Sequence, residues 1–284
     1  MNQIFYFWLK LSALFPMYLL NLSALKFSTL LSLTGYRKEV ILTNLRKSFP
    51  NYSETELIKL KSLIYKHLGQ LIAECIKAFS ISSKEIEQRV EFTNPELVQN
   101  YLDQDKDVIM VLGHFGNWEW ALLATSNHFN QELVGVYKPL SSKFWNEKLK
   151  KMRAKFGATL VSMKDSYRYI MKNNNRAKII GIIADQTPSK DEINYWTDFL
   201  NQKTPVFLGT EKLAKKLNCP VIFTHIETIK RGKYKISYEL ITDTPQNHFN
   251  GEITDLHTQL LQEKIKQKPQ HWLWSHRRWK HKQK

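Results

Sequence analysis

The sequence predicts an α/β fold in which helices flank a mixed, mostly parallel sheet, with a membrane-associated helix at the N-terminus. The sheet is predicted from two short apolar runs, 108–112 and 177–184, which are rich in β-branched residues and bounded by polar ones. Such runs are typical of parallel strands that are buried on both faces. Segments with helical spacing alternate with them, as in folds built from strand–helix–strand units. The N-terminal helix is predicted from a third feature, the apolar segment 4–33.

The N-terminal segment is mostly apolar but is interrupted by Lys10, Pro16 and Lys26. A helix over the uncharged stretch 11–25 covers about 22 Å, which is short of the ~30 Å hydrocarbon core of a bilayer. We therefore expect residues 1–34 to form an anchor helix that spans the membrane with snorkelling lysines or lies half buried in it. A helix buried in the protein core is the alternative.

Residues 35–284 are expected to form one further domain. Four basic residues follow the anchor, namely Arg37, Lys38, Arg46 and Lys47. Since basic residues next to a membrane segment stay on the cytoplasmic side, this domain is expected in the cytoplasm.

The remaining elements are predicted from hydrophobic spacing and from capping signals such as Ser53 with Glu56. Helices are expected at 36–49, 53–80, 83–90, 96–103, 118–127, 142–156, 165–171 and 251–267, with another helix ending at 217. Strands are expected at 108–112, 133–137, 159–163, 177–184, 219–229 and 233–241, and a polar loop at 187–204.

The chain is strongly basic, with 42 Lys and Arg against 26 Asp and Glu and a formal net charge of +16. Such a charge indicates an anionic partner, such as nucleic acid, a membrane surface or an acidic protein. Eight tryptophans accompany it, and Trp with Lys and Arg suits a membrane–water interface. Cys75 and Cys219 have no partners at metal-ligand spacing, so we expect small core residues and no disulfide framework.

His114 lies where the central strand gives way to a helix, and ligands of open α/β sheets bind outside the carboxyl ends of strands. Glu119 follows in the first turn of that helix, and Asn117 between them is a candidate cap. A neutral imidazole can take a proton near pH 7, and a carboxylate can fix its tautomer. The alternative is a turn histidine followed by an acid that the helix dipole favours.

A second polar pair, Asp185 and Gln186, follows the apolar run 177–184. Asp185 can orient a base or bind acceptor hydroxyls, and the alternative is an aspartate that caps a loop before Pro188. Thr210 lies near the start of a helix, where backbone amides can hold a phosphate or carboxylate. An ordinary N-cap is the alternative for this threonine.

The segment 113–119, with the sequence GHFGNWE, resembles the His-x4-acid motif of the late acyltransferases of lipid A biosynthesis. This is the lauroyl/myristoyl transferase family, within the wider glycerolipid and lysophospholipid acyltransferase group. Further segments resemble the family in the same order, at 35–37, 44–50, 184–186, 207–210 and 274–280. The chain departs from many relatives after Gln186, where it has Thr-Pro-Ser-Lys instead of a Gly-rich segment.

The resemblance implies a glycerolipid acyltransferase-like fold and an acyltransferase domain over residues 35–284. His114 would be the general base that activates the acceptor hydroxyl, and Glu119 would hold the imidazole. An apolar tunnel for the acyl chain is expected beside these two side chains. Substrate-binding roles are implied for Asn117, Lys138, Arg153, Asp185, Gln186 and Thr210.

The implied reaction moves a fatty acyl chain from a thioester of acyl carrier protein or CoA to a hydroxyl of a lipid A precursor. Neither a Gly-x-Ser-x-Gly elbow nor a reactive cysteine motif is present, so direct transfer is expected. No metal ion and no cofactor are expected. The expected location is the inner, cytoplasmic membrane, with its anionic surface as a partner and the site on the cytoplasmic side. Transfer to another membrane lipid, such as a lysophospholipid or aminolipid, is the alternative.

The basic tail from residue 264 carries eight Lys or Arg, no acid and three Trp. As composition alone it could be flexible, whereas the resemblance implies a folded element near the site. A protein that only binds nucleic acid or membrane surfaces is the non-enzyme alternative. Nucleic acid is not expected as a partner, because no helix-turn-helix, zinc or RNA-binding signature is present.

Overall fold

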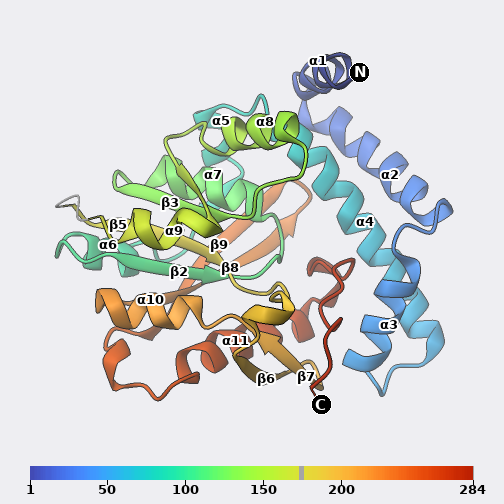
Figure 1. Cartoon of the computed structure of the whole chain (residues 1–284). Helices are drawn as coiled ribbons and strands as arrows, with labels where there is room; N and C mark the ends of the chain where they lie inside the picture. Colours follow the sequence, from blue (N-terminus) through green and yellow to red (C-terminus); the bar gives the residue numbers. More distant parts are fainter. Residues whose placement is uncertain (173–175, 284) are drawn as a thin grey trace.

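The computed structural model describes residues 1–172 and 176–283 and shows an α/β architecture (Figure 1). Seven strands form the main sheet in the order β1–β9–β8–β2–β5–β3–β4. Neighbouring strands are parallel except for the β8–β9 hairpin, which confirms the predicted mixed, mostly parallel sheet. The strands are β1 Val90–Phe92, β2 Val108–Leu112, β3 Glu132–Tyr137, β4 Thr159–Ser162, β5 Lys178–Ile183, β8 Val221–Lys230 and β9 Lys233–Thr242.

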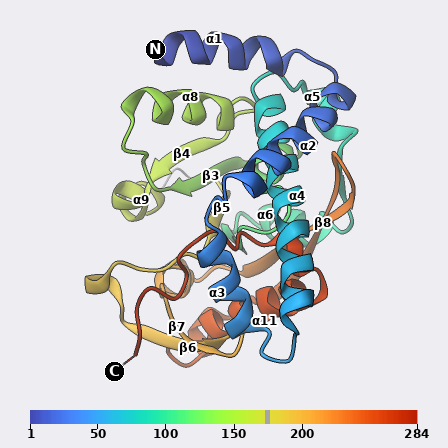
Figure 2. The same ribbon diagram turned by 90° about the vertical axis from the view of Figure 1, so that its right-hand side faces the viewer.

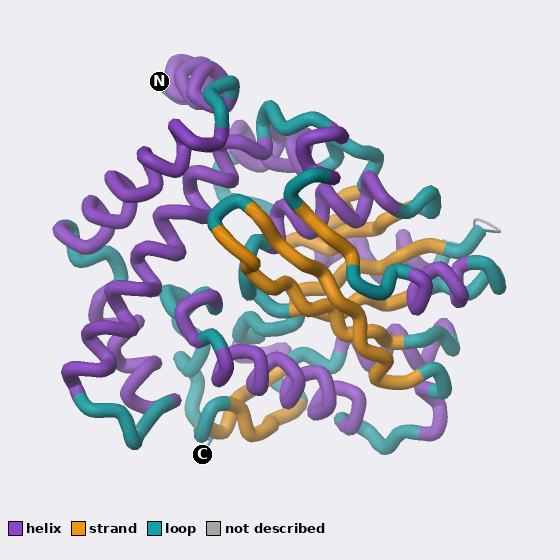
Figure 3. The backbone as a smooth tube through the Cα atoms, turned by 180° about the vertical axis from the view of Figure 1, so that it is seen from behind, coloured by secondary structure: helices purple, strands orange, loops and turns teal. Residues whose placement is uncertain are grey.

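Helices lie on both sides of the sheet, which runs through the middle of the molecule when it is seen from behind (Figure 3). Helices α5, α7 and α8 lie on one side and α10 and α11 on the other (Figure 1). The helices are α1 Asn2–Ala13, α2 Met17–Leu33, α3 Lys38–Ser48, α4 Glu54–Ala78, α5 Ser83–Glu87, α6 Glu96–Leu102, α7 Trp118–His128, α8 Lys143–Arg153, α9 Met163–Ile170, α10 Gly209–Leu217 and α11 Glu252–Gln267.

Strand β2 lies at the centre of the sheet, between β8 and β5, and its alternate side chains enter two different cores. Val108 and Met110 pack in the core that contains Trp120 of α7. Ile109 and Val111 pack in the second core, on the side of α10 and α11. Burial on both faces explains why the apolar run was continuous rather than alternating.

The N-terminal segment forms two helices, α1 and α2, instead of the expected single helix, and its role as a membrane anchor stays a prediction. The helices separate at Pro16, the N-cap of α2, because proline lacks the N–H and clashes with the preceding turn. Within the described residues, no helix is both long enough and apolar enough to cross a membrane. Helix α1 lies across one end of the molecule, and α2 runs beside α4 (Figures 1 and 2). Gly69 allows this close packing, since a Cβ there would lie 2.5 Å from the Ala24 carbonyl oxygen.

The expected polar loop at 187–204 contains a second, two-stranded sheet, β6 Tyr195–Phe199 and β7 Gln202–Val206. Two residues connect these strands, Leu200 and Asn201, with φ of 50° and 62°. A type I′ turn requires positive φ at both positions, and Asn-Gly is its usual sequence signal. With leucine at the first position this signal is absent, so the hairpin was not predicted. The short edge strand β1 was also missed, because its residues continue a polar helical pattern that ends at Glu87.

Candidate active site at the tips of strands β2 and β5

The site is built on two neighbouring parallel strands that end at the same edge of the sheet. Leu112 of β2 pairs in register with Ile183 of β5, so the residues that follow each strand meet. His114 Nδ1 lies 2.6 Å from Asp185 Oδ1, and the His114 backbone N–H donates to Asp185 Oδ2 at 2.7 Å. Asp185 therefore contacts both the backbone and the ring of His114, which is the geometry that an orienting role requires.

Asp185 is buried, and it also accepts a hydrogen bond from the Trp272 indole Nε1 at 2.8 Å. Burial raises the pKa of Asp185, but the charge of His114, the His114 hydrogen bonds and the Trp272 bond outweigh it and lower the pKa to about 2. The carboxylate is thus ionised at neutral pH. An ionised acceptor keeps the imidazole proton on Nδ1 and leaves the Nε2 lone pair for a substrate. Gln186 Nε2 lies 3.3 Å from this nitrogen.

Glu119 does not hold the imidazole, contrary to the sequence analysis. Both of its carboxylate oxygens accept hydrogen bonds from Arg153 of α8, from Nε at 2.8 Å and Nη2 at 2.5 Å. Glu119 lies in the first turn of α7, and α8 packs against this helix. This ion pair brings together two predicted site residues. The carboxylate that contacts the imidazole is instead Asp185, which follows β5.

The β2–α7 turn (residues 113–117) is held by Asn117, whose side chain is 1% exposed. Its Oδ1 accepts from the Trp120 N–H at 2.9 Å and caps α7, as the sequence suggested. Its Nδ2 donates to Glu74 Oε2 at 2.6 Å. Both ends of the amide are therefore used inside the protein and hold the turn, and substrate contact by Asn117 stays a prediction. Gly116 has a φ of +63°, which an L side chain rarely adopts.

Two further predicted residues lie outside this hydrogen-bond network. Lys138 is exposed just after β3, and Thr210 is buried in the first turn of α10. Thr210 is not the N-cap, because Leu208 occupies that position. Substrate contact by Lys138 or Thr210 stays a prediction.

The C-terminal segment is folded against the site, which confirms the expectation for the basic tail. Trp272 forms a β-bridge with Phe115, and the Leu273 N–H donates to the His114 carbonyl at 3.1 Å. Further along, Arg278 is buried and donates to the Pro205 carbonyl at 2.8 Å. The Asp185–Trp272 contact was not predicted, because nothing in the sequence distinguishes this tryptophan from the others nearby.

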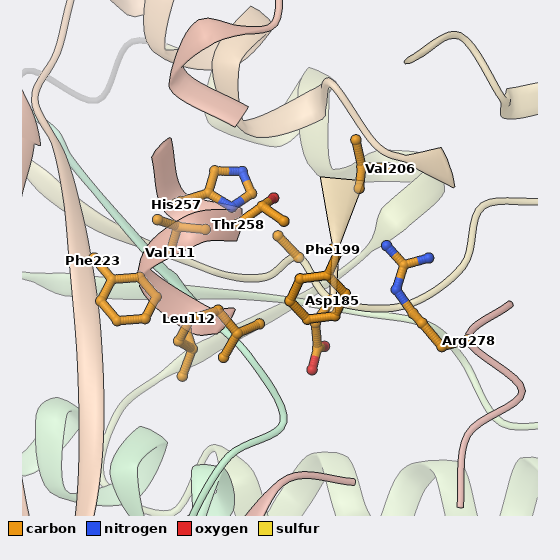
Figure 4. Close-up of a pocket in the computed structure, with 11 residues that line it drawn as sticks. Val111, Leu112, Asp185, Phe199, Val206, Phe223, His257, Thr258 and Arg278 are labelled. Carbon is orange, nitrogen blue, oxygen red and sulfur yellow. The ribbon is translucent and has the colours of Figure 1, made fainter. Parts of the chain in front are cut away.

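A small cavity of about 10 Å³ lies beside Asp185, between the sheet and α11 (Figure 4). Leu112, Phe223, Thr258 and Arg278 are among the side chains that line it. Its volume suits about one water molecule. It is too small for a fatty acyl chain, so it is not the apolar tunnel that was expected beside the pair.

A comparison with protein families identifies a family that matches nearly the whole chain. The model of the family described as bacterial lipid A biosynthesis acyltransferase matches residues 3–281. A comparison with curated proteins gave no match. The family match spans both strand tips, the N-terminal helices and the C-terminal segment, and it confirms the resemblance drawn from the motifs. The chain therefore belongs to the bacterial lipid A biosynthesis acyltransferase family, which is associated with the bacterial inner membrane.

Proposed function

We propose that the protein moves a fatty acyl chain from an acyl thioester to a hydroxyl of a lipid A precursor, with His114 as the general base. The observation that carries this proposal is the 2.6 Å bond between His114 Nδ1 and an ionised, buried Asp185. This bond fixes the tautomer in which Nε2 is basic. It also stabilises the imidazolium that forms when the proton is taken.

In the proposed reaction, the acceptor hydroxyl replaces the Gln186 amide at His114 Nε2 and gives up its proton there. The hydroxyl oxygen attacks the thioester carbonyl carbon, and the resulting tetrahedral intermediate expels the thiolate. The imidazolium returns its proton to the thiolate, which restores the base. Direct transfer, without an acyl-enzyme on cysteine, is supported by the environment of the two cysteines. Burial raises the pKa of Cys75 and Cys219 and makes both poor nucleophiles.

We assign the Glu119–Arg153 pair to interaction with the acyl donor. The two groups are held by two hydrogen bonds, and Arg153 remains one-quarter exposed. In this proposal, Arg153 stabilises the negative charge that develops on the thioester oxygen. Acyl carrier protein and CoA are both anionic, so either donor fits the net charge of +16. A basic cleft of about 360 Å³ between α3, β7 and the C-terminal segment adds to this attraction; it is lined by Lys47, Gln202, Lys203, Trp279, His281, Lys282 and Gln283.

The acceptor is proposed on different grounds from the base. The lipid A precursor follows from the family, whereas a lysophospholipid or aminolipid acceptor is the alternative. The segment after Gln186 favours this alternative, because it has Thr-Pro-Ser-Lys in place of the Gly-rich segment of many relatives.

The proposal is tested by incubating the purified protein with acyl thioesters and a lipid A precursor and following the lipid by mass spectrometry. We expect the mass of the precursor to rise by one acyl group, with both acyl carrier protein and CoA thioesters offered as donors. Other membrane lipids offered in parallel identify the alternative acceptors. Hydrolysis of the thioester without acylation of any lipid would contradict the proposal.

The N-terminal helices are proposed to lie in the membrane interface, with the site on the cytoplasmic side. Their outward faces carry exposed aromatic and aliphatic side chains, among them Phe7 at 62%, Trp8 at 59% and Leu33 at 81% exposure. Lys10 and Lys26 lie on the same helices. An apolar face with basic residues is typical of helices that lie on anionic membranes.

Replacing Phe7 and Trp8 together with aspartate is expected to weaken binding to vesicles that contain anionic lipids by about tenfold or more, because each large side chain contributes ~1.5–3 kcal/mol when fully buried. Vesicle co-sedimentation measures this change. Phe249, which is 84% exposed beside α10, provides the matched control. If Phe249→Asp weakens binding as much as the double change does, the assigned membrane face is wrong.

A further inference from the structure

Glu74 of α4 is a carboxylate with an exposed fraction of 0%. It accepts four hydrogen bonds, all from neutral groups. Oε2 accepts from Asn117 Nδ2 at 2.6 Å and from the Tyr234 hydroxyl at 2.5 Å. Oε1 accepts from Gln70 Nε2 at 2.8 Å and from the Gly232 N–H at 3.1 Å. Helix α4, the β8–β9 hairpin and the β2–α7 turn therefore meet at one buried acceptor.

A carboxylate in this position is unfavourable unless its hydrogen bonds to water are replaced. Burial raises the pKa of Glu74, and the four donors oppose this effect. An apolar side chain of similar size would avoid this penalty, but it would leave the four buried donors without an acceptor. The presence of a carboxylate therefore points to a role in orienting the groups that it contacts.

The groups that Glu74 orients form the start of α7. Asn117 can place Oδ1 on the Trp120 N–H only while its Nδ2 faces an acceptor, and Glu74 supplies that acceptor. The indole Nε1 of Trp120 also donates to the Glu74 backbone carbonyl at 3.0 Å. Asn117 lies between His114 and Glu119, and Trp120 directly follows Glu119.

We propose that Glu74 is a positioning residue for the acyltransferase reaction, which orients the Asn117 amide and thereby fixes the β2–α7 turn that carries His114. This proposal rests on the proposed function, in which His114 is the base. Glu74 has no contact with substrate in this role and acts only through Asn117. A misplacement of about 1 Å in a reacting group can slow a reaction about 100-fold, so a loose turn is expected to be costly.

The first test is Asn117→Asp, which keeps the cap oxygen but replaces the Nδ2 donor with an acceptor. Two carboxyl groups then face each other in a buried site, and the turn is expected to move. We expect kcat to fall about 10- to 100-fold, while KM for the lipid acceptor changes less than about threefold. Unchanged kcat would overturn the proposal.

The second test reverses the hydrogen bond by combining Asn117→Asp with Glu74→Gln. The new amide can donate to the new carboxylate and to the Tyr234 hydroxyl, which is able to accept. Its oxygen can still accept from Gln70 and the Gly232 N–H. We expect the double variant to recover at least about tenfold of the lost kcat. A folded double variant no more active than Asn117→Asp would overturn the proposal.

Tyr234→Phe is the matched control, because it removes a donor from the same Glu74 oxygen without changing Asn117. It is expected to lower the midpoint of thermal unfolding by a few degrees and to leave kcat within about threefold of the unchanged protein. A loss of kcat equal to that of Asn117→Asp would contradict the proposal, because kcat would then not depend on the Asn117 amide in particular.

Thermal unfolding of Glu74→Gln, Asn117→Asp and the double variant tests this proposal separately from the proposed function. A double-mutant cycle on the unfolding midpoints measures the coupling between positions 74 and 117 whether or not acyl transfer is detected. Coupling without any transfer by the unchanged protein would contradict the proposed function. Transfer without coupling would contradict the role of Glu74.

Discussion

His114→Gln is expected to lower kcat for acyl transfer at least about 100-fold, the lower end of what a general base contributes. The amide cannot take a proton from the acceptor hydroxyl at neutral pH, although it fills much the same space beside Asp185. Because the change removes the base and few binding contacts, KM for the lipid acceptor should change little. Steady-state kinetics with a fixed acyl thioester and varied acceptor measure both quantities.

The matched control is His128→Gln, at the C-terminal end of the same helix that follows the turn. His128 stacks on Phe92 at 4.4 Å between ring centroids and lies at the opposite end of α7 from the β2–α7 turn. Its replacement should leave kcat within about twofold of the unchanged protein. Near-normal turnover by His114→Gln would remove the base from the proposed mechanism.

Asp185→Asn is expected to lower kcat by about 10²- to 10⁴-fold by changing the imidazole tautomer. Asp185 Oδ2 accepts from two N–H groups, the His114 backbone and the Trp272 indole. The amide oxygen of asparagine must take that place, so its NH₂ group faces His114 Nδ1. An imidazole that accepts at Nδ1 carries its proton on Nε2 and cannot act as the base.

The tautomer can be measured directly by ¹⁵N NMR of labelled histidine, alongside kcat. Glu119→Gln is the matched comparison, because it changes the other carboxylate of the site. It should disturb Arg153 but leave the proton on Nδ1 of His114. If Glu119→Gln moves the proton and Asp185→Asn does not, the orienting role belongs to Glu119, as the sequence analysis held.

The sequence predicted the strand tips but not which carboxylate meets the imidazole. Strands β2 and β5 were recognisable because both of their faces are buried, and polar residues after such strands indicate a site. Asp185 reaches His114 because β5 is the neighbour of β2 in the sheet. Strand order depends on tertiary packing, whereas the His-x4-Glu spacing is local and favoured the nearer acid.

Other differences have similarly physical origins. The apolar composition is continuous on both sides of Pro16, so it predicts one helix where the proline in fact separates two. Trp272 lies 87 residues from Asp185 along the chain, and a contact over that separation leaves no local pattern. The Leu200–Asn201 turn was hidden because leucine rarely adopts positive φ, and the surrounding sheet must impose this conformation.

The order in which the site forms during synthesis follows from the separation of Asp185 and Trp272 along the chain. The carboxylate and the indole that donates to it are 87 residues apart. A nascent chain that already contains the paired strands β2 and β5 therefore lacks this donor until Trp272 has been made. Helices α1 and α2 precede all of these residues, so we expect them to be available to bind lipid before the hydrogen bonds around His114 are complete.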